Sequence, residues 1–319
     1  MQILFILDPL PSLAAYKDTS VAMMRALIRR GHEISVALQS QLYIEQGQVS
    51  MSGERITIDA HANLHEPNWW QSLATHERVN IRQFDAVVMR KDPPFDLEYL
   101  YATHILDLIE KQGVAVFNRG EAIRNHPEKL AITEFAQFTA PTLVTSNMAH
   151  IRAFHQEHQD VIVKPLDGMG GEGIFRLRPN EHNVGAILEL LTQHGTQTIM
   201  AQRYIPEIKN GDKRILLING EPMPYCLARI PLAGETRGNL AAGGRGVAQP
   251  LTQRDREIAE TVGPVLRARG LMLVGLDVIG EYLTEINVTS PTCFVEITQQ
   301  TDCDVAEHFA LALENAVAA

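Results

Sequence analysis

The residues best suited to chemistry lie in a glycine-rich loop that follows a run of apolar residues. Val161–Pro165 has the composition of a strand and contains Lys164, and a second short strand follows at 174–177. The loop between them carries four glycines, Gly168, Gly170, Gly171 and Gly173. Glycines let backbone N–H groups approach an anion without a Cβ in the way, and the lysine adds positive charge, so the pattern indicates a phosphate-binding loop. Gly-Lys-Ser/Thr is absent, so this is no Walker loop, and the glycines alone favour a simple turn.

Oxygen-bearing side chains farther along the chain form a candidate metal site, composed of Asp277, Glu285 and Asn287. Glu285 and Asn287 are two residues apart in an expected strand, so both point to one face. Mg²⁺ prefers hard oxygen ligands and binds beside phosphates. A three-residue turn at 280–282 would place Asp277 opposite Glu285, whereas a two-residue turn at 280–281 would send Asp277 to the other face. A polar edge hairpin with solvated acids explains these residues equally well on their own.

Arginines supply a third group of candidates. Arg214 and Arg229 flank an expected hairpin, and the glycine-rich segment 232–246 contains Arg237. Such a segment could close as a lid whose guanidinium groups bind carboxylates or phosphates. A surface loop with incidental arginines is the alternative. Arg90 follows an expected strand, where open α/β sheets border their ligands, although a proline-stiffened turn would also explain it.

The elements that must position these residues fall into two parts. Over residues 1–122, strands at 2–7, 33–38, 86–89 and 114–117 alternate with helices at 18–30 and 96–111, which predicts an α/β domain with a Rossmann-like parallel sheet. In the second part, 123–319, a helix containing Lys129 and further α/β elements occupy 123–200. The subdomain 201–319 has α+β character, and its Asn219-Gly220 pair predicts a type I′ hairpin between strands 214–218 and 222–230. Helices are expected at 252–269 and 304–317.

Composition excludes several classes of protein. The chain has 319 residues, 45% of them hydrophobic, and a formal charge of -10, which argues against nucleic acid as a partner. Its three cysteines are not spaced for a zinc site or a disulfide framework. We find neither a secretory signal nor a stretch long enough to cross a membrane, and therefore expect a cytoplasmic protein.

Several long motifs together resemble the bacterial glutathione synthetases, which are ATP-grasp ligases. The similarity spans nearly the whole chain. The segments that carry it are Met89–Asp96, Lys164–Gly171, Gly211–Arg214, Gly234–Gly246 and Thr284–Thr292. The resemblance implies an ATP-grasp domain at 123–319, after the N-terminal domain, with 232–246 as its lid. Glu172 departs from the family pattern, in which a small residue is typical at this position.

The resemblance also implies a role for each matching residue. ATP would be bound by Lys129, Lys164, Gly168, Gly170, Gly171, Gly173, Gln202, Tyr204, Ile205 and Asp212. Mg²⁺, or Mn²⁺ in its place, would be bound by Asp277, Glu285 and Asn287. The dipeptide or its reacting carboxylate would be bound by Arg90, Arg214, Arg229, Arg237, Gly243, Gly244 and Ser290. Lys164, Arg214 and Arg237 would take part in catalysis.

The implied reaction joins γ-glutamylcysteine to glycine, forms glutathione, and converts ATP to ADP and phosphate through an acyl phosphate. The implied partners are these small molecules, with no nucleic acid or membrane, and the family forms homotetramers. Two other functions remain open at this point. One is an ATP-grasp ligase for another acid and amine, and the other is a nucleotide-binding regulator without turnover. The full set Lys129, Lys164, Asp277, Glu285 and Asn287 argues against a regulator.

Overall fold

The N-terminal sheet has a parallel centre and an antiparallel extension. The computed structural model describes residues 1–232, 238 and 243–318. Four strands are parallel in the order β2-β1-β6-β7, and three antiparallel strands extend the β2 side. The parallel strands are β1 (Gln2–Ile6), β2 (Glu33–Ala37), β6 (Ala86–Met89) and β7 (Ala115–Phe117). The antiparallel strands are β3 (Leu42–Glu45), β4 (Gln48–Thr57) and β5 (Gln71–Asn80). The predicted parallel sheet is therefore confirmed for its centre only, and β3–β5 were not predicted.

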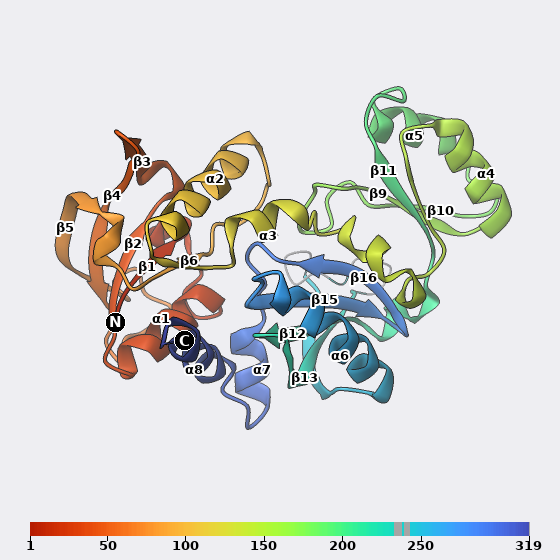
Figure 1. Ribbon diagram of the computed structural model, residues 1–319. Helices are drawn as coiled ribbons and strands as arrows, with labels where there is room; N and C mark the ends of the chain where they lie inside the picture. The colour runs from red at the N-terminus through yellow and green to blue at the C-terminus, as the bar shows by residue number, and fades with distance from the viewer. Residues whose placement is uncertain (233–237, 239–242, 319) are drawn as a thin grey trace.

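Strand β1 shows why helices cover both faces of this sheet. Its side chains alternate between two cores, with Ile3 and Phe5 in one and Leu4 and Ile6 in the other. The second core is completed by α2 (Leu97–Lys111). The first contains residues of α1 (Thr19–Arg29) and of α8 (Val305–Ala318), which lies beside α1 in Figure 1. Asp18 caps α1, and its side chain accepts a hydrogen bond from the backbone N–H of Val21 at 2.8 Å.

A smaller antiparallel sheet forms the separate lobe at the upper right of Figure 1. Its strand order is β10-β9-β11-β8. The strands are β8 (Thr142–Thr145), β9 (Val161–Pro165), β10 (Phe175–Leu177) and β11 (Ile199–Arg203). Helices α4 (Met148–His158) and α5 (Val184–Thr192) supply its core. Strand β11 continues past residue 200, the border that we expected between the two subdomains.

The third sheet carries most of the candidate residues. Its order is β14-β13-β12-β15-β16, and all pairs are antiparallel. The strands are β12 (Asp212–Ile218), β13 (Glu221–Ile230), β14 (Arg245–Pro250), β15 (Leu273–Ile279) and β16 (Tyr282–Asn287). Asn219 (φ 51°) and Gly220 (φ 83°) connect β12 and β13, which confirms the predicted hairpin. Helix α6 (Gln253–Ala268) packs on one face, and α7 (Phe294–Gln300) precedes α8.

The expected helix around Lys129 is not present. Residues 128–130 form a turn between α3 (Gly120–Asn125) and a 3₁₀ helix, η4 (Ala131–Phe138). The carbonyl oxygen of Glu128 accepts a hydrogen bond from the backbone N–H of Ile286 at 2.9 Å, so it is not paired within a helix. Long-range pairing has therefore replaced local helix formation at this turn. In the part of the chain that the structure describes, no helix has the length and apolar character needed to span a membrane.

Candidate active site

A cavity of about 320 Å³ lies between the small sheet and the third sheet. The glycine-rich loop after β9 lines one side, and residues of β12, β15 and β16 line the other. Fifteen of the predicted site residues line this cavity: Lys129, Lys164, Gly168, Gly170, Gly171, Gln202, Tyr204, Ile205, Asp212, Arg214, Arg229, Asp277, Glu285, Asn287 and Ser290. Residues that are far apart in the sequence thus converge on one site.

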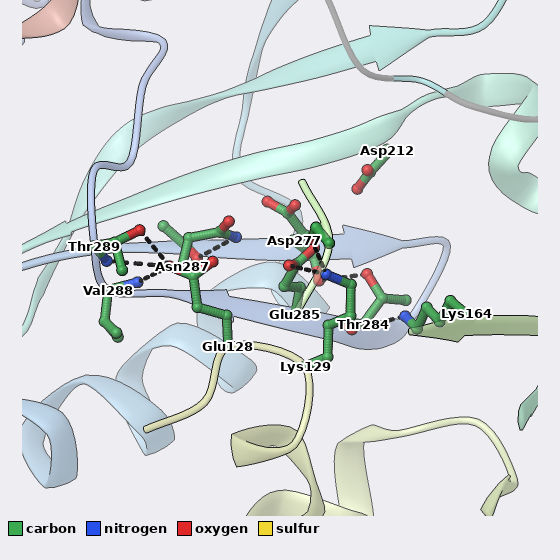
Figure 2. Close-up of polar contacts among 12 residues, drawn as sticks. Glu128, Lys129, Lys164, Asp212, Asp277, Thr284, Glu285, Asn287, Val288 and Thr289 are labelled. Carbon is green, nitrogen blue, oxygen red and sulfur yellow. Dashed lines mark hydrogen bonds and ion pairs between the residues drawn. The ribbon is translucent and has the colours of Figure 1, made fainter. Parts of the chain in front are cut away.

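The two predicted lysines both reach strand β16, Lys129 from the turn at 128–130 and Lys164 from β9 (Figure 2). Lys129 Nζ lies 3.2 Å from Glu285 Oε1 and also donates to the carbonyl oxygen of Gly168. Lys164 Nζ donates to the carbonyl oxygen of Thr284 at 3.3 Å. Burial lowers the pKa of Lys164, and Glu285 partly opposes this effect. Each lysine therefore provides a largely desolvated amine beside the cavity.

The glycine-rich loop uses backbone conformations that suit glycine. Gly170, Gly171 and Gly173 have φ values of 63°, 85° and 70°. A Cβ on Gly173 would lie 2.9 Å from Pro165 Cγ, so this residue also permits close packing against the end of β9. Gly173 itself does not line the cavity, whereas the exposed Glu172 does.

The acidic residues come together because of a β-bulge. Strands β15 and β16 pair Ile279 with Tyr282, so the turn has two residues, Gly280 and Glu281. A two-residue turn was expected to send Asp277 to the other face. However, Thr284 is an extra residue in β16, and the shifted register places Asp277 directly opposite Glu285. Asp277, Glu285 and Asn287 consequently share one face of the sheet.

Cross-strand pairs extend this polar face over the neighbouring strands. Arg214 is opposite Asp277, and Asp212 is opposite Arg229. Arg214 Nε donates to Asp277 Oδ1 at 2.6 Å, and Arg229 Nη2 lies 2.8 Å from Asp277 Oδ2 and 2.6 Å from Asp212 Oδ2. The result is a buried row of alternating charges, Asp212–Arg229–Asp277–Arg214.

The two aspartates of this row have opposite pKa shifts. Burial alone would raise the pKa of Asp277, but Arg214 and Arg229 together hold it well below its ordinary value. Burial, together with the nearby charge of Asp277, raises the pKa of Asp212 to about 6 against the opposing effect of Arg229. Asp212 Oδ1 is buried and has no hydrogen-bond partner among the described residues. Asp212 is thus the less completely paired acid and retains a free acceptor.

The predicted metal ligands have suitable donor chemistry. Asn287 Nδ2 donates to the carbonyl oxygen of Gly275 at 3.2 Å, and the described residues make no hydrogen bond to its Oδ1. Asp277 and Glu285 supply carboxylates next to that oxygen, which is the ligand type that Mg²⁺ prefers. Among the described residues, no three His, Cys, Asp or Glu side chains form a metal-binding group by themselves. The Asn287 amide oxygen would add a third protein ligand to the two carboxylates.

Some predicted residues lie elsewhere. Arg90 is buried behind the cavity wall, where it donates to Ser20 Oγ at 2.9 Å and to the carbonyl oxygen of Pro291 at 3.1 Å. Gly243 and Gly244 do not line the cavity. Arg237 lies outside the described residues, and the predicted lid is described only at its ends and at Gly238.

Sequence reasoning missed several parts of the site. Glu128, Asp92 and Thr289 line the cavity, and Ser290 Oγ donates to Asp92 Oδ1 at 2.5 Å. Ile162, Ile174, Ile208 and Ile279 were also missed, and together with the predicted Ile205 they form an apolar wall. The adjacent Glu-Lys pair at 128–129 was the signal that could have suggested Glu128, but its partners are about 160 residues away in the sequence.

Comparisons with known proteins agree with this architecture. Residues 1–124 match the N-terminal domain of prokaryotic glutathione synthetase, and residues 128–302 match its ATP-grasp domain. The glutathione synthetase of Bordetella pertussis is 66% identical over 316 residues, which are 99% of each chain. The glutathione synthetase of Neisseria meningitidis serogroup A is 56% identical over 310 residues, which are 97% of each chain.

Solved structures show the same fold at low sequence identity. D-cycloserine synthetase DcsG has a TM-score of 0.68 and 15% identity, with 99% of both chains covered. The ATP-grasp ligase PsnB has a TM-score of 0.63 and 17% identity, with 100% of this chain and 98% of that chain covered. The matches to the two domains and to full-length relatives show that this chain belongs to the prokaryotic glutathione synthetase family and has the ATP-grasp fold.

Proposed function

We propose that the chain joins γ-glutamylcysteine to glycine and converts ATP to ADP and phosphate. The observation that carries this proposal is the convergence of Lys129, Lys164 and the ladder Asp277–Glu285–Asn287 on one cavity. The identity of 66% with a curated glutathione synthetase over 99% of both chains supports the choice of substrates.

The cationic side of the cavity suits the triphosphate. Lys129 and Lys164 would bind its phosphate oxygens, and the loop 168–173 would cover them with backbone N–H groups. Gln202, Tyr204 and Ile205 would contact the adenine against the isoleucine wall, and Asp212 would bind the ribose through its free acceptor. Asp277, Glu285 and Asn287 would hold Mg²⁺, or Mn²⁺ in its place, which neutralises phosphate charge.

Arginines would bind and orient the reacting carboxylate. In the first step, the cysteinyl carboxylate of the dipeptide attacks the γ-phosphorus and displaces ADP, forming an acyl phosphate. In the second step, the glycine amine attacks the acyl carbon, the bond from that carbon to the phosphate oxygen breaks, and phosphate and the amine proton leave. Arg214 and Arg229 line the cavity and would lie where negative charge develops, because fixed charges in a site with little water stabilise such charge strongly. Ser290 would contact the dipeptide directly, and Arg90 would act through its contact with Pro291.

Phosphate release tests the proposal. The chain is incubated with ATP and Mg²⁺ and with γ-glutamylcysteine plus glycine, and each component is omitted in turn while mass spectrometry detects the tripeptide. We expect release that needs both amino-acid substrates and yields glutathione. Release with a different acid and amine would show another ATP-grasp ligase, and no turnover with any pair would indicate a regulator. A homotetramer, a cytoplasmic location and the domain border near residue 122 remain predictions.

A further inference from the structure

The backbone groups on the outer edge of strand β16 form hydrogen bonds with a turn and with side chains instead of with another strand. Because β16 is the last strand of its sheet, the polar groups of alternate residues point away from β15. The N–H of Ile286 donates to the carbonyl oxygen of Glu128 at 2.9 Å, and the N–H of Val288 donates to Glu128 Oε1 at 2.9 Å. Lys164 binds the carbonyl oxygen of Thr284 on the same edge. Glu128 thus takes the place of a neighbouring strand over residues 286–288.

One oxygen of Glu128 accepts three hydrogen bonds. Besides the Val288 N–H, Oε1 accepts from the N–H of Thr289 at 3.1 Å and from Thr289 Oγ1 at 2.8 Å (Figure 2). Loss of this acceptor would leave two backbone N–H groups in a partly buried position without a partner, which is costly.

The residues held in this way are next to proposed ligands. Asn287 directly precedes Val288, and Ser290 directly follows Thr289. On the other side of the turn, Lys129 connects Glu285 with the carbonyl oxygen of Gly168 in the glycine-rich loop. Glu128 and Lys129 therefore connect strand β16 physically to the glycine-rich loop.

We propose that Glu128 is a positioning residue. Its hydrogen-bond acceptors hold Asn287 and Ser290 where these residues can bind the metal and the dipeptide. The inference rests on the proposed function, because the roles of Asn287 and Ser290 come from it. The position of the Oε1 acceptor, and not the negative charge of Glu128, is the feature that matters. Glutamine has the same shape and keeps one side-chain oxygen, so Glu128→Gln preserves the acceptor while Glu128→Ala removes it.

Kinetics of the two variants distinguish position from charge. Displacement of catalytic groups by about 1 Å can lower the rate by about 100-fold, so we expect kcat of Glu128→Ala to fall by about that factor. Glu128→Gln should recover most of the loss. The matched control is Glu121→Ala, because Glu121 is exposed on α3, and its kcat should equal that of the wild type. Thr289→Val removes a single bond to Oε1 and provides a milder variant if Glu128→Ala does not fold.

A binding measurement gives an independent readout. Titration calorimetry measures the Kd of ADP with and without Mg²⁺, and we expect the gain in affinity from Mg²⁺ to be lost in Glu128→Ala and kept in Glu128→Gln. Equal impairment of both variants would overturn the inference in favour of a role for the charge. If Glu128→Ala had a lower Tm but the same kcat and the same gain in ADP affinity from Mg²⁺ as the wild type, the role of Glu128 would be structural only. Failure of the wild type to form glutathione would contradict the proposed function, whereas the ADP titration would still test Glu128.

Discussion

Lys213 and Arg214 are adjacent cations with different expected effects when replaced. Arg214 faces the cavity, whereas Lys213 lies on the opposite face of β12 and forms an ion pair with Asp255 of α6. The Asp255 side chain is 0% exposed and that of Lys213 is 12% exposed. Lys213 Nζ also donates to the carbonyl oxygen of Gly280 in the β15–β16 turn at 3.1 Å. Lys213 therefore connects α6 with the hairpin that carries the acidic ladder.

Replacement of Lys213 by methionine keeps most of the stem but leaves a buried carboxylate without its counterion. Removal of one partner of such a pair costs about 3–5 kcal/mol. The control is Glu257→Ala, which breaks an ion pair with Arg254, where the side chains of Arg254 and Glu257 are 28% and 57% exposed. Exposed pairs contribute about 0–1 kcal/mol, so the control should lose far less stability.

Urea unfolding followed by circular dichroism measures this difference. The double variant Lys213→Met, Asp255→Asn removes both charges and should recover most of the lost stability, since paired removal of buried charges is often neutral. At low temperature, where the protein stays folded, Lys213→Met should keep the wild-type kcat. A loss below about 1 kcal/mol, or a large fall in kcat of the folded variant, would refute the assignment of Lys213 to structure.

Three further predictions concern acidic residues. Glu285→Ala should abolish turnover while the protein still folds, because a proposed metal ligand is lost; wild-type activity would contradict this. Glu172→Ala should lower KM for ATP by up to about fivefold, since it removes an exposed carboxylate worth about 0.2–1 kcal/mol beside the phosphates; an unchanged or higher KM would disprove it. Hydrogen bonds from Arg30 and His32 lower the pKa of Glu314 from 4.5 to about 2, so this group stabilises the fold above pH 4.5 and loses that effect as the pH falls to about 2. Thermal unfolding of Glu314→Gln should therefore show a lower Tm than the wild type at pH 7 and a much smaller difference near pH 2, and a constant difference across this range would exclude the linkage.

Local patterns in the sequence predicted the elements whose conformation is set by their own residues. The Asn219-Gly220 turn follows from positive φ at both positions, and β9 with its glycine-rich loop follows from an apolar run and the glycines. The resemblance to a known family then identified fifteen of the thirty residues that line the cavity. These predictions depend on neighbours in the sequence or on motifs that can be compared directly.

Features that depend on distant partners were not predictable in this way. The residues around Lys129 predict a helix, but hydrogen bonds between Glu128 and β16 hold this segment as a turn. A two-residue turn alone would place Asp277 on the face opposite to Glu285, but the bulge at Thr284 shifts the register and brings both residues to one face. No residue pattern near Thr284 indicates a bulge. Strand β5 was missed because its mostly exposed residues lack a clear apolar alternation, and β4 was missed because its alternation is short, with Val49 and Met51 buried.

The contact between α1 and α8 has a consequence for synthesis on the ribosome. Met23 and Met24 of α1 share one core with Phe309 and Leu313 of α8, which lie almost 300 residues later in the sequence. While the chain is being translated, that apolar face of the N-terminal domain stays uncovered until α8 has emerged. Nascent chains of this protein would therefore expose an apolar surface for most of their elongation. We expect chaperones that bind apolar segments to act on this surface.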